Sequence, residues 1–253
     1  MLQKKNIIIR NLNIQYFQSE NINKNNAVVF LHGWGSHAMH FQKTLEKCEN
    51  FVAIDLPGFG NSEAPKTAWS LADYSLFISD FLQKLNIKNP IVAGHSFGGS
   101  IGIKYCSDKN KCKKLILIGS AGIRKKNIKK YGFFIAAKIF GILFSLPFLG
   151  NLKEIVRKRY YKAIDSEDYI NAGALTETYR KVINEDLTNN LEKISTPTIL
   201  IWGKNDEDTP LEDGKLMNQL IKNSHLFIVS NAKHYVFLDN EKEFNEIFLS
   251  QIK

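Results

Sequence analysis

Residues 94–98 read Gly-His-Ser-Phe-Gly, a pattern that suits a serine acting as a nucleophile. An apolar run at 90–93 precedes the pattern, and a helical pattern begins near Gly99. A sharp turn from strand to helix would strain the backbone of Ser96 and expose its hydroxyl, provided that its neighbours are small. The Phe97 amide would then lie at a helix N-terminus, where it can donate to an anion. We therefore predict a nucleophilic serine at residue 96.

A serine hydroxyl is a weak nucleophile and needs a base within hydrogen-bonding reach. His234 follows an apolar run at 225–229, so we expect it at the carboxyl end of a strand, where open parallel sheets place their sites. His95 adjoins Ser96, but neighbouring side chains on a sharp turn point apart. We therefore assign His234 as the general base and give His95 a structural or oxyanion-supporting role.

The base needs a carboxylate that orients it and stabilises its protonated form. The apolar run at 198–202 is followed by two candidates, Asp206 and Asp208. We choose Asp206 and keep Asp208 as the alternative, because Asp208 or Thr209 is also suited to cap a helix that begins after Pro210.

An oxyanion needs two donors aimed at the developing negative charge. The Phe97 amide is one. The second is expected from the loop 32–35, His-Gly-Trp-Gly, whose glycines allow the backbone to turn an amide inward after the apolar run at 28–31. We assign the Trp34 amide, while the Trp34 side chain is also suited to packing against the pocket.

The elements that must position these groups follow from the hydrophobic pattern. Strands are predicted at 5–10, 12–17, 27–31, 51–54, 90–93, 114–118, 198–202 and 225–229, and helices near 39–47, 70–86, 99–107, 211–222 and 241–252. This alternation favours an α/β fold with a mostly parallel eight-stranded sheet and helices on both faces. We predict two core segments, 1–121 and 196–253, separated by a helical cap at 122–195.

Several motifs together resemble the α/β-hydrolase superfamily, in its serine hydrolase branch. They are His32-Gly33-Trp34-Gly35, Asp55-Leu56-Pro57-Gly58-Phe59-Gly60-Asn61-Ser62, Gly94-His95-Ser96-Phe97-Gly98-Gly99, Gly203-Lys204-Asn205-Asp206 and His234. Lys233 departs from the family, which usually has glycine before this histidine. The resemblance implies ester cleavage by acyl transfer through Ser96, Asp206 and His234, without a metal or organic cofactor.

The apolar stretch 131–150 lies in the expected cap, and its glycines and proline argue against a membrane span. Candidates to line an acyl pocket are Phe133, Phe134, Phe140 and Phe144. Residues 123–162 contain eleven Lys and Arg and one Glu. This cap could dock an acidic carrier protein or an anionic membrane surface, and the docking candidates are Arg157, Lys158 and Arg159.

The substrate stays open among several classes. We favour a general carboxylesterase for short-to-medium acyl esters. The motifs also resemble the pimeloyl-acyl-carrier-protein methyl ester esterases and the meta-cleavage C–C hydrolases. A ligand-binding homologue without activity is the non-enzyme alternative, which the presence of all three candidate catalytic residues disfavours.

Composition bounds the remaining possibilities. The 253 residues carry 34 Lys and Arg against 25 Asp and Glu, a formal net charge of +9, yet no nucleic-acid-binding motif accompanies the charge. Cys48, Cys106 and Cys112 lack metal spacing, so we expect three reduced thiols. The N-terminus lacks the apolar region of a signal peptide, and we expect a cytoplasmic protein.

Overall fold

The computed structural model describes residues 2–108, 112–124 and 173–253, and these form one eight-stranded sheet. Its strands are β1 (Leu2–Ile9), β2 (Leu12–Ser19), β3 (Val28–Leu31), β4 (Phe51–Ile54), β5 (Ile91–His95), β6 (Lys114–Ile118), β7 (Thr198–Gly203) and β8 (Ser224–Val229). All eight predicted strands are present, with end shifts of up to three residues.

The strand order in the sheet is β1-β2-β4-β3-β5-β6-β7-β8. The β1–β2 and β2–β4 pairs are antiparallel, and every other pair is parallel. The predicted mostly parallel sheet is therefore confirmed. Because β3 and β5 to β8 run in one direction, the loops that follow them meet at one edge of the sheet.

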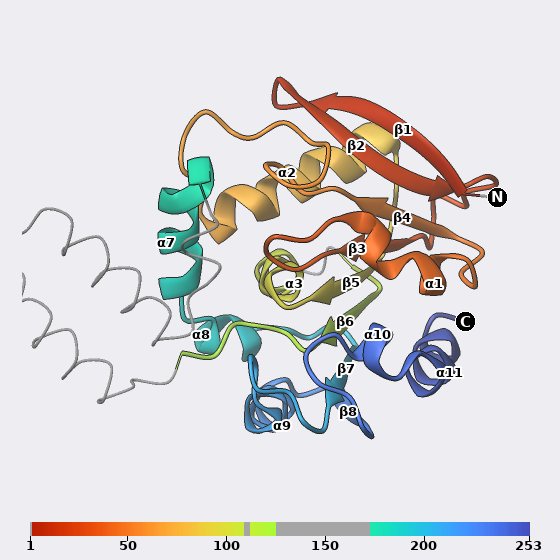
Figure 1. Ribbon diagram of the computed structural model, residues 1–253, viewed down its shortest axis with the longest axis vertical. Coiled ribbons are helices and arrows are strands. Elements are labelled where there is room, and N and C mark those ends of the chain that lie inside the picture. Colours follow the sequence, from red (N-terminus) through yellow and green to blue (C-terminus); the bar gives the residue numbers. More distant parts are fainter. Residues whose placement is uncertain (1, 109–111, 125–172) are drawn as a thin grey trace, which may run out of the picture.

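Helices cover both faces of the sheet (Figure 1). The described helical elements are η1 (Ala38–Phe41), α1 (Gln42–Leu45), α2 (Leu71–Leu85), α3 (Phe97–Ser107), η3 (Gly173–Leu175), α7 (Thr176–Asn184), α8 (Thr188–Leu191), α9 (Leu211–Leu220), α10 (Val236–Asp239) and α11 (Glu241–Gln251). The short α10 was not predicted. None of the described helices is both long and apolar enough to cross a lipid bilayer.

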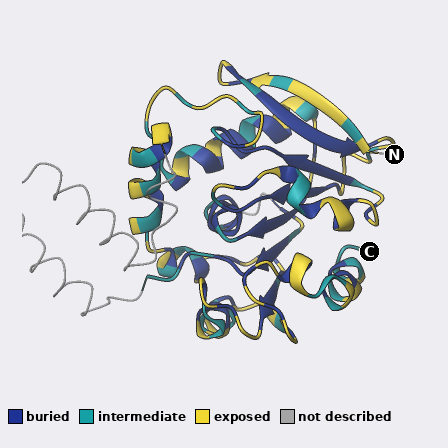
Figure 2. Ribbon diagram, in the orientation of Figure 1, coloured by how far each residue is buried: buried dark blue, intermediate teal, exposed yellow. Residues whose placement is uncertain are grey.

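The central strands contribute to a hydrophobic core on each face, which explains their continuous apolar sequence. In β3, Val29 and Leu31 face the core that includes side chains of α2, α3 and α9, whereas Val28 and Phe30 face the core that includes α10 and α11. Figure 2 shows these strands as buried and the edge strand β1 as largely exposed on one side.

The predicted cap falls mostly on residues 125–172, which lie outside the described residues, as do its phenylalanine and arginine candidates. The domain boundaries stay a prediction. The helix α7, which lies near the end of the predicted insertion, is held by hydrogen bonds to the segment just before α2. Thr178 Oγ1 accepts a 3.0 Å hydrogen bond from the Trp69 amide, and Lys181 Nζ donates to the Ala68 carbonyl at 2.8 Å.

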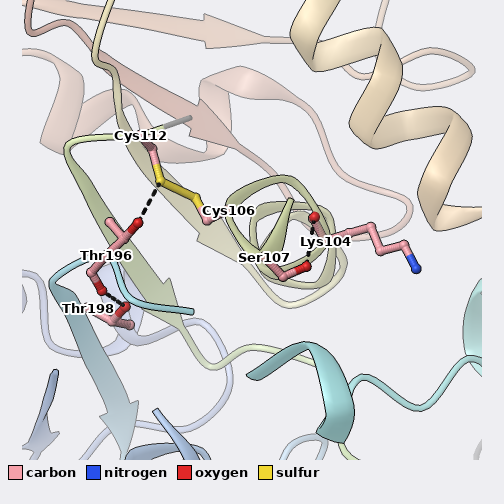
Figure 3. The surroundings of a disulfide bond; sticks show 6 residues. All are labelled: Lys104, Cys106, Ser107, Cys112, Thr196 and Thr198. Carbon is pink, nitrogen blue, oxygen red and sulfur yellow. Dashed lines mark hydrogen bonds between the residues drawn. A yellow bond between two sulfur atoms is a disulfide. The ribbon is translucent and has the colours of Figure 1, made fainter. Parts of the chain in front are cut away.

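The cysteines differ from the prediction of three reduced thiols. Cys106, near the end of α3, and Cys112, just before β6, form a disulfide (Figure 3), while Cys48 is a free buried thiol whose pKa burial raises to about 11. The prediction was wrong for the pair because α3 and β6 are successive elements of a β-α-β unit. Their junction brings the two Cα atoms within 6.2 Å, a separation that a disulfide spans.

We expect one alkylated cysteine when the protein is denatured with iodoacetamide in the absence of reductant, and three after reduction. Intact mass measurement counts the modifications. Closing a loop this short by a disulfide contributes about 2 kcal/mol, so the double variant Cys106→Ser/Cys112→Ser should lose about that much unfolding free energy. Three modified thiols without reductant would contradict the pairing.

Candidate active site

The turn between β5 and α3 has the strained geometry expected of a nucleophilic serine. Ser96 has φ 49° and ψ −113°, in a region that non-glycine residues rarely occupy. A Cβ on Gly94 would lie 2.4 Å from the Gly98 carbonyl oxygen, and one on Gly98 would lie 2.1 Å from the Leu31 carbonyl oxygen. The glycines are therefore required by close backbone approach, and α3 begins at Phe97, directly after Ser96.

The loops after β7 and β8 bring Asp206 and His234 together. His234 Nδ1 lies 3.0 Å from Asp206 Oδ2 and 3.2 Å from Oδ1, and the side chain of Asp206 is fully buried. Because a carboxylate only accepts, we assign the Nδ1 proton of His234 to this bond, which leaves Nε2 as an acceptor. Of the two predicted carboxylates, Asp206 is the one that bonds to His234.

The Asp206 carboxylate is held by its own loop. Oδ1 accepts from the amides of Asp208 and Thr209 at 3.0 and 2.9 Å, and Thr209 Oγ1 lies 2.9 Å from Oδ2. Neither Asp208 nor Thr209 caps α9, whose N-cap residue is Pro210 without a side-chain cap. Sequence reasoning missed the role of Thr209 beside the carboxylate. The available signal was a hydroxyl residue three positions after an aspartate, the spacing of a local side-chain turn.

Gly119, after β6, is a second residue that sequence reasoning missed. Its φ is 46°, and a Cβ there would lie 3.1 Å from Asp206 Oδ2 and 3.5 Å from His234 Nδ1. A side chain at this position would press against the carboxylate–imidazole pair.

Gly203, at the end of β7, allows the main chain of the loop after β8 to come close. A Cβ at residue 203 would lie 2.2 Å from the Lys233 carbonyl oxygen. Lys233 itself has no positive φ, so the loop does not require the glycine usual in the family.

No hydrogen bond joins Ser96 Oγ to His234 Nε2 among the contacts of the described residues. Such contacts often tighten only when substrate binds. The ring of His95, the residue before Ser96, lies 4.7 Å from the ring of His234, so the turn that carries Ser96 lies beside His234.

The two predicted oxyanion donors lie on neighbouring segments. Phe97 is the first residue of α3, and its amide has no intrahelical partner. The Trp34 amide donates to no described residue. The indole of Trp34 packs against Phe97 at 5.3 Å, Phe59 at 4.8 Å and Tyr179 of α7 at 5.0 Å between ring centroids. Its side chain thus joins the loop after β3 to α3 and to α7.

His32 and Asp55 hold the loop that carries Trp34. The Leu56 amide donates to His32 Nε2 at 3.0 Å, which assigns the proton to Nδ1, and Nδ1 donates to the Gly33 carbonyl at 2.7 Å. Asp55 accepts from the Ala38 amide at 2.8 Å. Burial lowers the pKa of His32 to about 4, so the ring is neutral at ordinary pH. These contacts make His32 a structural residue.

One ligand atom each of Asp206, Asp208 and His234 lies within 4.8 Å of the others, a spacing that could hold a metal ion. The sequence had predicted no metal. His234 Nδ1 and the Asp206 carboxylate already form a hydrogen bond with each other, and a cation would have to displace the proton in that bond. The donor set therefore fits an acid–base pair better than a resident metal centre.

An α/β sheet that carries a serine at a strained strand-to-helix turn is typical of hydrolases. Residues 28–247 match the alpha/beta hydrolase family. The chain therefore belongs to this family, as the motifs had led us to expect.

Three similar proteins illustrate the range of the family. Lipase 3 of Moraxella sp. is 26% identical over 253 residues, covering 90% of this chain and 77% of the lipase. The 2-hydroxy-6-oxononadienedioate/2-hydroxy-6-oxononatrienedioate hydrolase of Cupriavidus pinatubonensis is 24% identical over 245 residues, covering 87% and 84%. The esterase EaEST from Exiguobacterium antarcticum superposes with a TM-score of 0.73 at 23% identity, covering 99% of each chain.

The buried histidine His32 predicts a dependence of stability on pH. Its pKa is about 4 in the folded protein against the ordinary value of 6.5 for a histidine of the unfolded chain, so only the unfolded chain takes up this proton between these values. This contribution is present above pH 6.5 and is lost as the pH falls towards 4, at about 1.4 kcal/mol per pH unit. Urea unfolding between pH 6.5 and 4.5 measures the slope.

The variant His32→Gln removes the titrating ring and keeps a polar side chain. Its unfolding free energy should fall less steeply with decreasing pH than that of the wild type, by about 1.4 kcal/mol per unit. Equal slopes in the two proteins would show that His32 takes up its proton over the same pH range in the folded protein as in the unfolded chain.

Proposed function

We propose that the chain is a serine hydrolase that cleaves a carboxylic ester through an acyl-enzyme intermediate. The observation that carries the proposal is the 3.0 Å contact between His234 Nδ1 and Asp206 Oδ2, at the same edge of the sheet as the strained Ser96. A buried carboxylate that orients an imidazole next to an activated serine is what acyl transfer requires.

The proposed reaction proceeds in two halves. Ser96 Oγ attacks the ester carbonyl carbon while His234 Nε2 takes its proton, and the amides of Phe97 and Trp34 stabilise the oxyanion. Breaking the C–O bond releases the alcohol, which receives the proton from His234. Water, with His234 again as base, then attacks the acyl-enzyme, releases the carboxylic acid and restores Ser96. Asp206 stabilises the imidazolium in both halves.

The aromatic rings beside the proposed oxyanion donors favour an apolar acyl group. Trp34, Phe59, Phe97 and Tyr179 pack together next to Ser96 with centroid distances of 4.8 to 6.0 Å. In the proposed complex these rings would form an apolar wall beside an acyl group bound at Ser96. The names of Lipase 3 and of the esterase EaEST agree with an ester substrate.

A fluorophosphonate probe should label the wild-type protein with a stoichiometry of one, and Ser96→Ala should abolish both labelling and ester hydrolysis. The expected loss of kcat is about 10⁴-fold or more, because the nucleophile is removed. Ser120→Ala is the matched control. Ser120 is a buried serine two residues after the end of β6, and its substitution should leave labelling intact. Absence of labelling in a folded wild type would refute the proposal.

The acid is tested by comparing two neighbouring carboxylates. Asp206→Asn should lower kcat by roughly 10²- to 10⁴-fold with KM little changed, because the amide no longer stabilises the imidazolium. The kcat of Asp208→Asn should remain within about 2-fold of the wild type. Asp208 hydrogen-bonds to Asp206 only through its backbone amide, which the substitution keeps. Equal losses in the two variants would contradict the assignment of Asp206.

The substrate class is tested with a panel. We expect hydrolysis of p-nitrophenyl esters with short-to-medium acyl chains. A second arm offers a 2-hydroxy-6-oxo-diene-dioate, because a relative is named for hydrolysis of a compound of that class. A third arm offers a methyl ester bound to an acyl carrier protein. Faster turnover of the diene than of any ester would replace ester cleavage by C–C hydrolysis.

If the carrier ester is the best substrate, charge reversal at Arg157, Lys158 and Arg159 tests the docking proposal. At low salt the triple variant should lose turnover of the carrier ester and keep turnover of small esters, because electrostatic attraction between the carrier and the cap would be lost. Unchanged turnover of the carrier ester would refute docking through these residues.

A further inference from the structure

His95 is buried at the meeting point of the three segments that carry the proposed chemistry. It is the last residue of β5, directly before Ser96, and it is 1% exposed. Its ring lies 4.7 Å from the ring of His234, 5.1 Å from Tyr235 and 5.1 Å from Phe237. On another side it meets Gly33 of the loop that carries Trp34, where an added Cβ would lie 2.9 Å from His95 Nδ1.

Only one of the two ring nitrogens of His95 has a hydrogen-bond partner among the described residues. Its Nε2 lies 3.0 Å from the carbonyl oxygen of His234. Since a carbonyl oxygen only accepts, we assign the ring proton to Nε2, which donates. Nδ1 is buried and has no hydrogen-bond partner among the described residues. An unpaired buried acceptor is costly, so packing alone does not account for a histidine at this position.

The bond reaches the backbone of the proposed base. Asp206 holds His234 through its side chain, at Nδ1, and His95 holds it through its main chain, at the carbonyl. Two anchors on one residue restrict both the position of its Cα and the rotation of its ring. The main chain before His234 is also held, because the Asn205 amide donates to the Ala232 carbonyl at 2.9 Å and the Lys233 amide donates to Asp239 Oδ2 at 2.8 Å. The bond from His95 is the one that acts on the carbonyl of His234 itself.

We propose that His95 is a positioning residue, which fixes the main chain of His234 so that Nε2 of His234 faces Ser96. The proposal rests on the function proposed above. It also links the two halves of the machinery, because His95 and the nucleophile are adjacent in sequence. Any shift of the turn at Ser96 is then transmitted to the base, and their separation is kept.

The electrostatics of the site support a fixed tautomer. Burial, and next the charge of His234, lower the pKa of His95 well below its ordinary value. The charges of His32 and His40 act in the same direction, while the hydrogen bond to the His234 carbonyl acts against them. A ring that remains neutral keeps its single proton on Nε2 and keeps donating to the carbonyl through the working pH range.

The test compares His95→Gln with His95→Met. Glutamine places an N–H donor at about the same distance from Cα as the histidine Nε2, whereas methionine fills similar space without a donor. We expect His95→Met to lower kcat for a p-nitrophenyl ester by about 10- to 100-fold, because small misplacements of a base have effects of this size. KM should be unchanged, and His95→Gln should recover most of the loss.

Phe237→Leu is the matched control for packing. Phe237 is 2% exposed and contacts the His95 ring, but its hydrocarbon side chain has no hydrogen-bonding group and lies outside the proposed machinery. The melting temperature of this variant should fall while kcat per folded molecule stays within about 2-fold of the wild type. If His95→Met matched this behaviour, losing stability without kcat, His95 would be a packing residue only and the proposal would be overturned.

A measurement on the wild type covers the case in which His95→Met does not fold. Long-range ¹⁵N–¹H spectra report which ring nitrogen carries the proton, and His95→Gln identifies the signals. We expect a neutral ring with the proton on Nε2, unchanged from pH 5 to 8. A proton on Nδ1, or titration in this range, would overturn the proposal. A wild type that hydrolyses no ester and takes up no fluorophosphonate would instead refute the proposed function.

Discussion

The backbone at Ser96 crosses from β5 to α3 with a positive φ, and this crossing governs the geometry of the whole site. Strain of this kind costs on the order of 1–3 kcal/mol and persists only where the surroundings hold it. Here the surroundings are backbone, because Gly98 packs against the Leu31 and His32 carbonyl oxygens and Gly94 packs against α3. The turn, the loop after β3 and the N-terminus of α3 are therefore one rigid unit.

The neighbouring loops depend on the same close approach. Ala121 N donates to the Ser96 carbonyl at 3.1 Å, so the segment after β6 is joined to the turn. That segment contains Gly119, which leaves room for the Asp206–His234 pair. The His234 carbonyl in turn accepts from His95. A serine, an imidazole and a carboxylate from three distant parts of the sequence are thus connected by hydrogen bonds, in which the carbonyls of Ser96 and His234 take part.

Sequence patterns predicted the elements well because the central strands bury both faces. Continuous apolar runs such as 114–118 and 198–202 leave little choice but interior strands of a parallel sheet. The turn at Ser96 was predictable because only glycines tolerate its approach. The disulfide of Cys106 and Cys112 and the hydrogen bond from His95 to the His234 carbonyl were not predicted. The disulfide depends on how the chain passes from α3 to β6, and the hydrogen bond depends on which loops lie beside one another. Hydrophobic periodicity reports neither.

By itself the sequence determined the order of strands and helices, the position of the strained turn and the residue types available at the ends of β5, β7 and β8. It also narrowed the acid to two aspartates. Only the tertiary structure shows that Asp206 is the one that bonds to His234, because this contact is a 3.0 Å distance between side chains that are 28 residues apart. Periodicity and local turn chemistry act over a few residues, whereas hydrogen-bond geometry at a sheet edge is set by how the whole sheet twists and packs.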